Sequence, residues 1–253
     1  MNNLKVCVVS SFNNSIKYID RFLHAIFSLE FPSENIFYHF LENDSQDDTF
    51  NRLSLLSLEN AKVKVSKLEN KKRDLFPNYY SFLGYLHASI QAKILEDIDG
   101  SDYILWIDSD VIKIDPLFLS KSINLVSNKV KAICPMVLME GNGANIFYDT
   151  AGFKINGKNF SNFYPFFESY EKGRLFKIDS GGVCFLFEHD LFPLKFEGER
   201  LGNLNSAGIP IIHWNFVCED IINRGYEILL DTDLEVFHIN HAVEGLPIFK
   251  KWS

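Results

Sequence analysis

The first half of the chain alternates short apolar runs with amphipathic helical segments, and this alternation limits the possible folds most strongly. Some of these runs are continuously apolar and rich in β-branched residues, and others alternate between apolar and polar residues. Both patterns are typical of strands. Strands are therefore predicted at 5–12, 35–42, 61–68 and 102–108. Helical patterns fill the intervals, and the longest covers residues 79–98. Alternating strands and helices are typical of an α/β domain with a mainly parallel sheet.

The second half has a different pattern, with short strands and loops rich in Gly, Asn and Phe from residue 140 onward. The segment "FKIDSGGVCFLFEHDLF" predicts two strands around a Gly181-Gly182 turn. The segment "LEVFHINH" predicts a last strand that ends on histidines. Because no linker or repeat separates the two halves, we expect one continuous domain over residues 1–253.

Composition restricts the class of protein. The 253 residues are 47% hydrophobic and include 24 Phe, which is enough for one large core. A net charge of −8 argues against a nucleic-acid partner, because such proteins normally carry a basic stripe. The four cysteines are widely spaced, as expected for buried free thiols. With no secretory signal and no run near the ~20 apolar residues that span a bilayer, we expect no transmembrane segment and a cytoplasmic location.

Clustered carboxylates follow two of the predicted strands, in "FLENDSQDDTF" (40–50) and "YILWIDSDVI" (103–112). Open parallel sheets bind ligands beyond the carboxyl ends of their strands. Asp108 and Asp110 flank Ser109, so one carboxylate can ligate a hard divalent cation while the other holds a sugar hydroxyl or a metal-bound water. Glu42 and Asp44 can accept hydrogen bonds from a base or ribose. The alternative for both clusters is a solvated turn that caps a helix.

The ordered motifs resemble the GT-A fold of nucleotide-sugar glycosyltransferases. "LENDSQDDT" and "ILWIDSDV" look closest to the fungal mannan-type mannosyltransferases (glycosyltransferase family 62), and more loosely to family 2. The resemblance continues through "ANIFYDTAGF", "IDSGGVCFLF" and "CEDIINRGYEILLDTDLEVFHINH". It implies a single Rossmann-like GT-A domain, with a nucleotide-sugar half at 1–115 and an elaborated acceptor half at 116–253.

The resemblance implies a metal-dependent hexosyltransferase that moves a sugar from a GDP- or UDP-linked donor to a glycan or other hydroxyl acceptor. It makes Asp108 and Asp110 the DxD-type metal and donor residues, and His238 the C-terminal metal ligand, with His241 as its competitor. This mixed oxygen and nitrogen set suits Mn²⁺, with Mg²⁺ as the other candidate. The predicted donor-binding residues are Ser10, Ser11, Glu42, Asp44, Asp108, Ser109 and Asp110.

On the acceptor side, the resemblance makes Glu219 or Asp220 the catalytic carboxylate, and a helix-dipole role is the alternative. Gly181 and Gly182 are predicted to let the backbone approach the acceptor, unless they only form a tight hairpin. The aromatic residues of "FSNFYPFFESY" (160–170) could stack on an acceptor sugar or pack within a loop. Whether the enzyme retains or inverts the anomeric configuration stays open.

The sequence departs from the mannan-type pattern before the DxD strand, because "SFLGYLHASIQAKI" lacks the Arg residues of that family's helix. Basic residues that could contact the donor phosphates instead are Lys71, Lys72, Arg73, Lys250 and Lys251. A sugar nucleotidyltransferase is a second candidate, although the segment "SSFNNS" after the first strand lacks the usual Gly-rich basic loop. A non-catalytic sugar- or partner-binding module is the third, and the presence of both acidic pairs argues against it.

Overall fold

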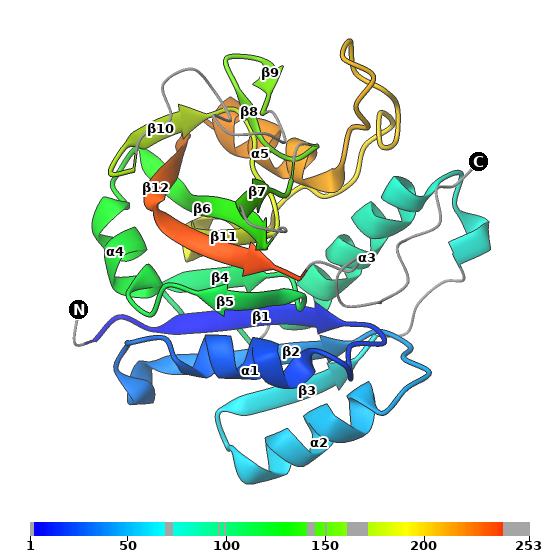
Figure 1. Cartoon of the computed structure of the whole chain (residues 1–253), viewed down its shortest axis with the longest axis vertical. Coiled ribbons are helices and arrows are strands. Elements are labelled where there is room, and N and C mark those ends of the chain that lie inside the picture. Colours follow the sequence, from blue (N-terminus) through cyan, green and yellow to red (C-terminus); the bar gives the residue numbers. More distant parts are fainter. Residues whose placement is uncertain are drawn as a thin grey trace.

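The computed structural model describes residues 3–68, 73–95, 97–98, 100–140, 145–149, 151–160 and 172–239, which form a mixed sheet with helices on both faces (Figure 1). The sheet strands are β1 (Val6–Phe12), β2 (Ile36–Glu42), β3 (Val63–Lys67), β4 (Tyr103–Ile107), β5 (Val111–Ile114), β6 (Val130–Glu140), β7 (Asn145–Phe147), β10 (Leu175–Ile178), β11 (Cys184–Glu188) and β12 (Glu227–His238). A separate hairpin joins β8 (Lys154–Ile155) to β9 (Lys158–Asn159). The helices are α1 (Ile19–Phe27), α2 (Thr49–Glu59), α3 (Tyr79–Ile94), α4 (Phe118–Leu125) and α5 (His213–Asn223).

The strand order confirms the predicted α/β sheet. The order is β10-β12-β6-β11-β4-β1-β2-β3, and the run from β4 to β3 is parallel throughout. All four strands predicted in the first half are present within two residues of their expected ends. The other half is mixed, because β11 runs antiparallel to both of its neighbours, β4 and β6. The parallel half therefore directs the ends of β1, β2 and β4 to one edge.

The two strands predicted around Gly181 and Gly182 are present, but they do not form a hairpin. β10 and β11 flank the two glycines in sequence but are not neighbours in the sheet. β10 pairs with β12, whereas β11 lies between β4 and β6. The predicted last strand is also part of a longer one, because β12 is continuous over Glu227–His238 with a register shift between Asp231 and Glu235.

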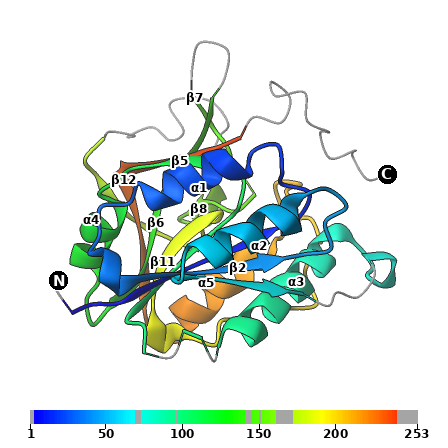
Figure 2. The same cartoon turned by 90° about the horizontal axis from the view of Figure 1, so that it is seen from below.

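Aromatic side chains fill the core on both faces of the sheet. On one face, the Phe12 ring lies 5.2 Å from Phe22 of α1 and 5.3 Å from Phe40, in edge contacts. On the other face, the Trp106 ring meets Trp214 of α5 at 6.1 Å, also edge-on. Figure 2 shows α1 and α2 on one side of the sheet, with α3 and α5 on the other. Such pairs add to the apolar area that each ring buries.

A buried histidine joins β2, β3 and the segment after α3. His39 lies 2.9 Å from the Ser66 hydroxyl through Nε2 and 3.1 Å from Asp97 through Nδ1. Asp97 also pairs with Lys64 at 2.5 Å. Burial lowers the pKa of His39 to about 4, against the opposing effect of Asp97 and with help from Lys64. The Ser66 hydroxyl satisfies Nε2 of His39, which would otherwise be a costly unpaired polar atom inside the sheet.

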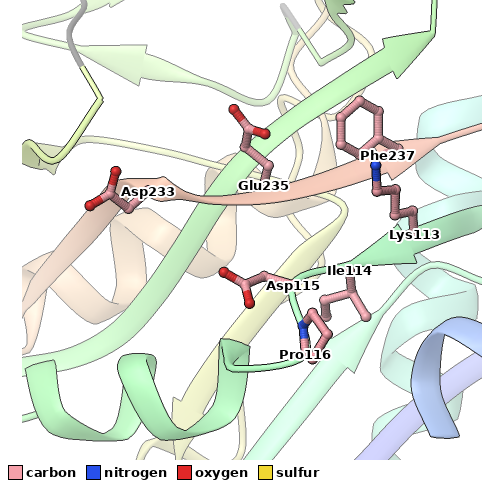
Figure 3. Close-up of a pocket in the computed structure, with 7 residues that line it drawn as sticks. All are labelled: Lys113, Ile114, Asp115, Pro116, Asp233, Glu235 and Phe237. Carbon is pink, nitrogen blue, oxygen red and sulfur yellow. The ribbon is translucent and has the colours of Figure 1, made fainter. Parts of the chain in front are cut away.

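A pocket of about 210 Å³ lies between β5 and β12, next to the register shift in β12 (Figure 3). Its lining residues are Lys113, Ile114, Asp115, Pro116, Asp233, Glu235 and Phe237. Two of the carboxylates are already paired, Asp115 with Lys121 at 2.8 Å and Glu235 with Lys172 at 2.7 Å. The pocket contains none of the residues predicted to bind substrate or metal.

Across the described ranges, no helix combines the length and the apolar character that crossing a membrane would require.

Candidate active site

The turn that carries Asp108 and Asp110 connects β4 to β5 and is held by two other strands. The Asp108 N–H donates to the Val183 carbonyl before β11 (2.9 Å). The Asp110 carbonyl accepts from the Ile239 N–H after β12 (2.8 Å). Val183 has φ +65°, a conformation that costs a β-branched residue roughly 1–3 kcal/mol, so its surroundings must impose it. The backbone therefore brings residues 108–110 against segments more than 70 positions later in the chain.

These contacts place His238 directly beside Asp110. Nε2 of His238 lies 2.9 Å from Oδ2 of Asp110, and the histidine is 2% exposed. Nδ1 lies 2.8 Å from the Ile239 carbonyl, so an Nδ1–H donates there and directs Nε2 toward the carboxylate. Burial opposes protonation of His238, but Asp110, the Ile239 carbonyl and Asp108 outweigh it and raise its pKa. Two of the three residues predicted to ligate a metal are thus in direct contact.

A third carboxylate, Asp149, was not predicted and lies just after β7. Its Oδ1 accepts from the Gly152 N–H (2.8 Å), and its charge acts on Asp108. A Cβ at Gly182 would lie 2.1 Å from Asp149 Oδ2 and 3.3 Å from the Trp214 ring, so any other residue there would displace the Asp149 carboxylate. We call Asp108, Asp110, Asp149 and His238 the carboxylate centre.

Excess negative charge marks the carboxylate centre. Burial raises the pKa of Asp108 well above its usual range, and Asp110 and Asp149 add to this while His238 opposes it. Burial also raises the pKa of Asp149, although the Gly152 and Ala151 N–H groups and His238 each lower it. Three half-buried carboxylates share one imidazole, and like charges held this close and partly shielded from water repel one another unless a cation lies between them. A divalent cation would supply the missing charge.

The side-chain atoms of the carboxylate centre suit a metal ion whose remaining coordination positions are filled by substrate. Among the described residues, no three His, Cys, Asp or Glu side chains are arranged to hold a metal ion. Mg²⁺-type ions are usually held by one or two carboxylates together with substrate phosphates, so a complete protein cage is not required. The 2.9 Å between Asp110 Oδ2 and His238 Nε2 matches the ~3.0 Å between adjacent ligands of an octahedral ion. The residues present therefore fit a divalent cation.

Three tyrosines surround the carboxylate centre and were not predicted. Tyr18 hydrogen-bonds Ser109 and Ser15, and Tyr148 stacks on His238. Burial, with Asp110 among the further causes, raises the pKa of Tyr18 to about 12. The pKa of Tyr79 is also raised to about 12, mainly by burial and further by Asp110 and Asp108, against a nearby arginine. The tyrosine hydroxyls therefore stay protonated and can donate hydrogen bonds at neutral pH.

Arg73 lies near the tyrosines around the carboxylate centre, as a contact with the donor phosphates would require. Its guanidinium lies over the Tyr79 ring at 4.3 Å from the centroid, just before α3. The same ring is close enough to Asp108 and Asp110 for both to raise its pKa. Several residues of the sequence predictions lie outside the part of the chain that the structure describes. These are His241, Lys71, Lys72, Lys250, Lys251 and the aromatic residues within 161–170.

The residues predicted at the ends of β1 and β2 differ in accessibility. Ser10 has no exposed surface, which argues against direct contact with a donor, whereas Ser11 is partly exposed. Glu42 is buried, and its Oε1 accepts from the Ser45 N–H (2.5 Å). Asp44 is exposed and adopts φ +52°, a left-handed conformation that Asp tolerates. Asp44 and Ser11 are therefore the members of this set with surface for a ligand.

The predicted acceptor-side residues are engaged elsewhere. Glu219 pairs with Arg200 at 2.5 Å and is 48% exposed, and Asp220 lies 3.6 Å from Arg224. The first turn of α5 approaches the carboxylate centre instead. Its Trp214 lies beside Gly182, and its Asn215 donates from Nδ2 to the Ser180 hydroxyl (2.7 Å). A Cβ at Gly181 would meet the Cys134 sulfur at 2.9 Å, so protein atoms fill the space there too.

Comparison with known proteins gives fold-level matches. No protein-family model matches the chain, and no curated protein matches it. Among solved structures, GalNAc-T7 with UDP, GalNAc and Mn²⁺ has a TM-score of 0.61 and 14% identity over 94% of this chain and 44% of that one. S. aureus TarS 1-349 with UDP-GlcNAc has a TM-score of 0.58 and 14% identity over 94% and 59%. Mannosyltransferase PcManGT from Pyrobaculum calidifontis, with GDP-Man and Mn²⁺, has a TM-score of 0.56 and 11% identity over 92% of this chain and 56% of that one.

The chain has the GT-A fold. All three neighbours are glycosyltransferases of that fold, and each alignment covers more than nine tenths of this chain. The expected GT-A architecture is therefore confirmed. At these identities the likeness extends to fold alone, and the chain spans only 44 to 59% of the three neighbours' own lengths.

Proposed function

We propose that this GT-A chain is a divalent-cation-dependent glycosyltransferase that moves a sugar from a nucleoside-diphosphate donor to a hydroxyl acceptor. The observation that carries the proposal is the carboxylate centre, where Asp110 contacts His238 beside two further half-buried carboxylates. Its position after β4, at the ligand-binding edge of the parallel strands, is where a nucleotide is expected.

The structural neighbours support the class of ligand. Their structures contain UDP-GlcNAc in TarS, GDP-Man with Mn²⁺ in PcManGT, and UDP with Mn²⁺ in GalNAc-T7. We therefore infer a UDP- or GDP-linked donor and Mn²⁺, with Mg²⁺ as the alternative ion. Membership of family 62 is part of the proposal, because it rests on the order of motifs in the sequence.

In this proposal the cation is held by Asp110 and His238, with Asp108 beside them. When bound, it neutralises the charge that develops on the leaving diphosphate. Arg73 adds positive charge on the same side, while Asp44 and Ser11 contact the nucleoside and Ser109 the donor sugar. The protonated hydroxyls of Tyr18 and Tyr79 donate hydrogen bonds to donor oxygens. The nucleotide-sugar half at 1–115 contains all of these residues except His238.

The acceptor side has three candidate carboxylates. Asp149 has the strongest position, because it belongs to the carboxylate centre and burial raises its pKa, as suits a general base. Glu219 and Asp220 remain proposals, as do Gly181 and Gly182 as acceptor contacts. Assays of Asp149→Asn against Asp220→Asn and Glu219→Gln would identify which carboxylate the reaction needs.

A donor panel tests the proposed function. The full chain is incubated with UDP-GlcNAc, UDP-glucose or GDP-mannose, plus simple sugars as acceptors, and release of the nucleoside diphosphate is followed with Mn²⁺ or with chelator. We expect turnover of one donor that requires Mn²⁺. Pyrophosphate release from a nucleoside triphosphate and a sugar phosphate would instead support a nucleotidyltransferase. No metal-dependent turnover in any assay would favour a binding module.

A further inference from the structure

Tyr148 and His238 form a face-to-face aromatic stack inside the proposed active site. Their ring centroids lie 3.6 Å apart with an interplanar angle of 15°. The Tyr148 N–H donates to the Val137 carbonyl of β6 (3.0 Å), which fixes the backbone that carries the ring. The two residues are 90 positions apart in sequence, so the tertiary fold alone produces this contact.

The stack restrains a rotation of the imidazole that its contacts with Ile239 and Asp110 do not restrain. Nδ1 is bonded to the Ile239 carbonyl at 2.8 Å, and Nε2 lies 2.9 Å from Asp110. These two contacts define an axis in the plane of the imidazole, but they do not prevent the ring from tilting about it. The Tyr148 ring lies against the face of the imidazole and blocks that tilt.

We propose that Tyr148 is a positioning residue that holds the imidazole of His238 in the orientation needed to bind a divalent cation. The inference rests on the proposed function, because it takes His238 as a ligand. Residues that orient a metal-bound histidine typically change metal affinity 10–100-fold when they are removed. Tyr148 is 37% exposed, so its replacement removes a partly exposed side chain and not one from the core.

The test compares Tyr148→Ala with Tyr148→Phe by Mn²⁺ affinity, measured from the electron paramagnetic resonance signal of free Mn²⁺, alone and with UDP or GDP. We expect Tyr148→Ala to weaken Mn²⁺ binding 10–100-fold, and Tyr148→Phe to stay within about twofold of wild type, since the phenyl ring preserves the stack. The matched control is Phe27→Ala, which removes an aromatic residue of 38% exposure from α1. The control should bind Mn²⁺ like wild type.

Two outcomes overturn the inference, and they are distinguishable. Equal Mn²⁺ affinity in wild type and Tyr148→Ala would show that the stack only packs, and the proposed function would stand. No Mn²⁺ binding by wild type, with or without nucleotide, would remove the metal site and the proposed function with it. Thermal unfolding midpoints of all variants verify that each one folds, and a weakened affinity restored in Tyr148→Phe excludes general loss of structure.

Discussion

Asp110→Asn is expected to lower metal-dependent donor turnover by at least about a hundredfold. The change removes the charged oxygen that lies 2.9 Å from His238 Nε2, while keeping the shape of the side chain. A catalytic cation stabilises developing charge by several kcal/mol, and each ~1.4 kcal/mol corresponds to a factor of ten in rate. Initial rates of nucleoside-diphosphate release at saturating Mn²⁺ provide the measurement.

Asp115→Asn is the matched control for this experiment. Asp115 follows the other end of β5, has 22% exposure against 23% for Asp110, and is paired with Lys121 rather than with a histidine. It should retain the wild-type rate. Turnover by Asp110→Asn within about threefold of wild type would contradict the assignment of Asp110 as a ligand.

Acidification is expected to destabilise the fold through a buried pair of histidines between α3 and α5. His87 and His213 stack with ring centroids 3.9 Å apart, and they are 6% and 5% exposed. Burial lowers the pKa of His87 to about 4, despite the Leu83 carbonyl, and lowers that of His213 well below its usual value with help from His87. The unfolded chain protonates these side chains near pH 6.5, so folding loses free energy as pH falls below that value.

The expected loss of unfolding free energy on acidification follows from the lowered pKa of His87. Between pH 7 and pH 5, His87 alone should cost roughly 2 kcal/mol of unfolding free energy, and the loss should level off below about pH 4. The raised pKa values of Asp108 and Asp149 act in the opposite direction, so the informative quantity is a difference between variants. Urea unfolding of wild type and His87→Phe at both pH values provides it. His87→Phe should lose about 2 kcal/mol less on acidification, whereas equal losses would contradict the account.

The sequence could predict the parallel half of the fold because its signals are local. Each of β1, β2 and β4 is an apolar run with its own end, and α1, between β1 and β2, has a clear 3.6-residue period. The pairing in the second half is not local. β11 follows β10 in sequence, yet β12 and β6 separate the two strands in the sheet, and no turn residue could reveal that.

For the candidate site too, the sequence could predict the residues with a local signal but not the contacts made by the tertiary fold. Asp108 and Asp110 follow a buried strand, and this signal placed them correctly at the strand end. Asp149 carries the same signal, since "NIFYD" is another apolar run closed by an acid, but the run is short and lies in an irregular region. The stacking of Tyr148 on His238 depends on tertiary geometry, so no sequence pattern indicates it.

Calorimetric titration of the wild-type chain with UDP and with GDP, each with Mn²⁺ and with chelator, tests the central claim most directly. If the carboxylate centre binds a nucleoside diphosphate through a divalent cation, one nucleotide should bind with Mn²⁺ and lose measurable affinity with chelator. Failure of both nucleotides to bind at millimolar concentration, or equal binding with chelator, would contradict the claim.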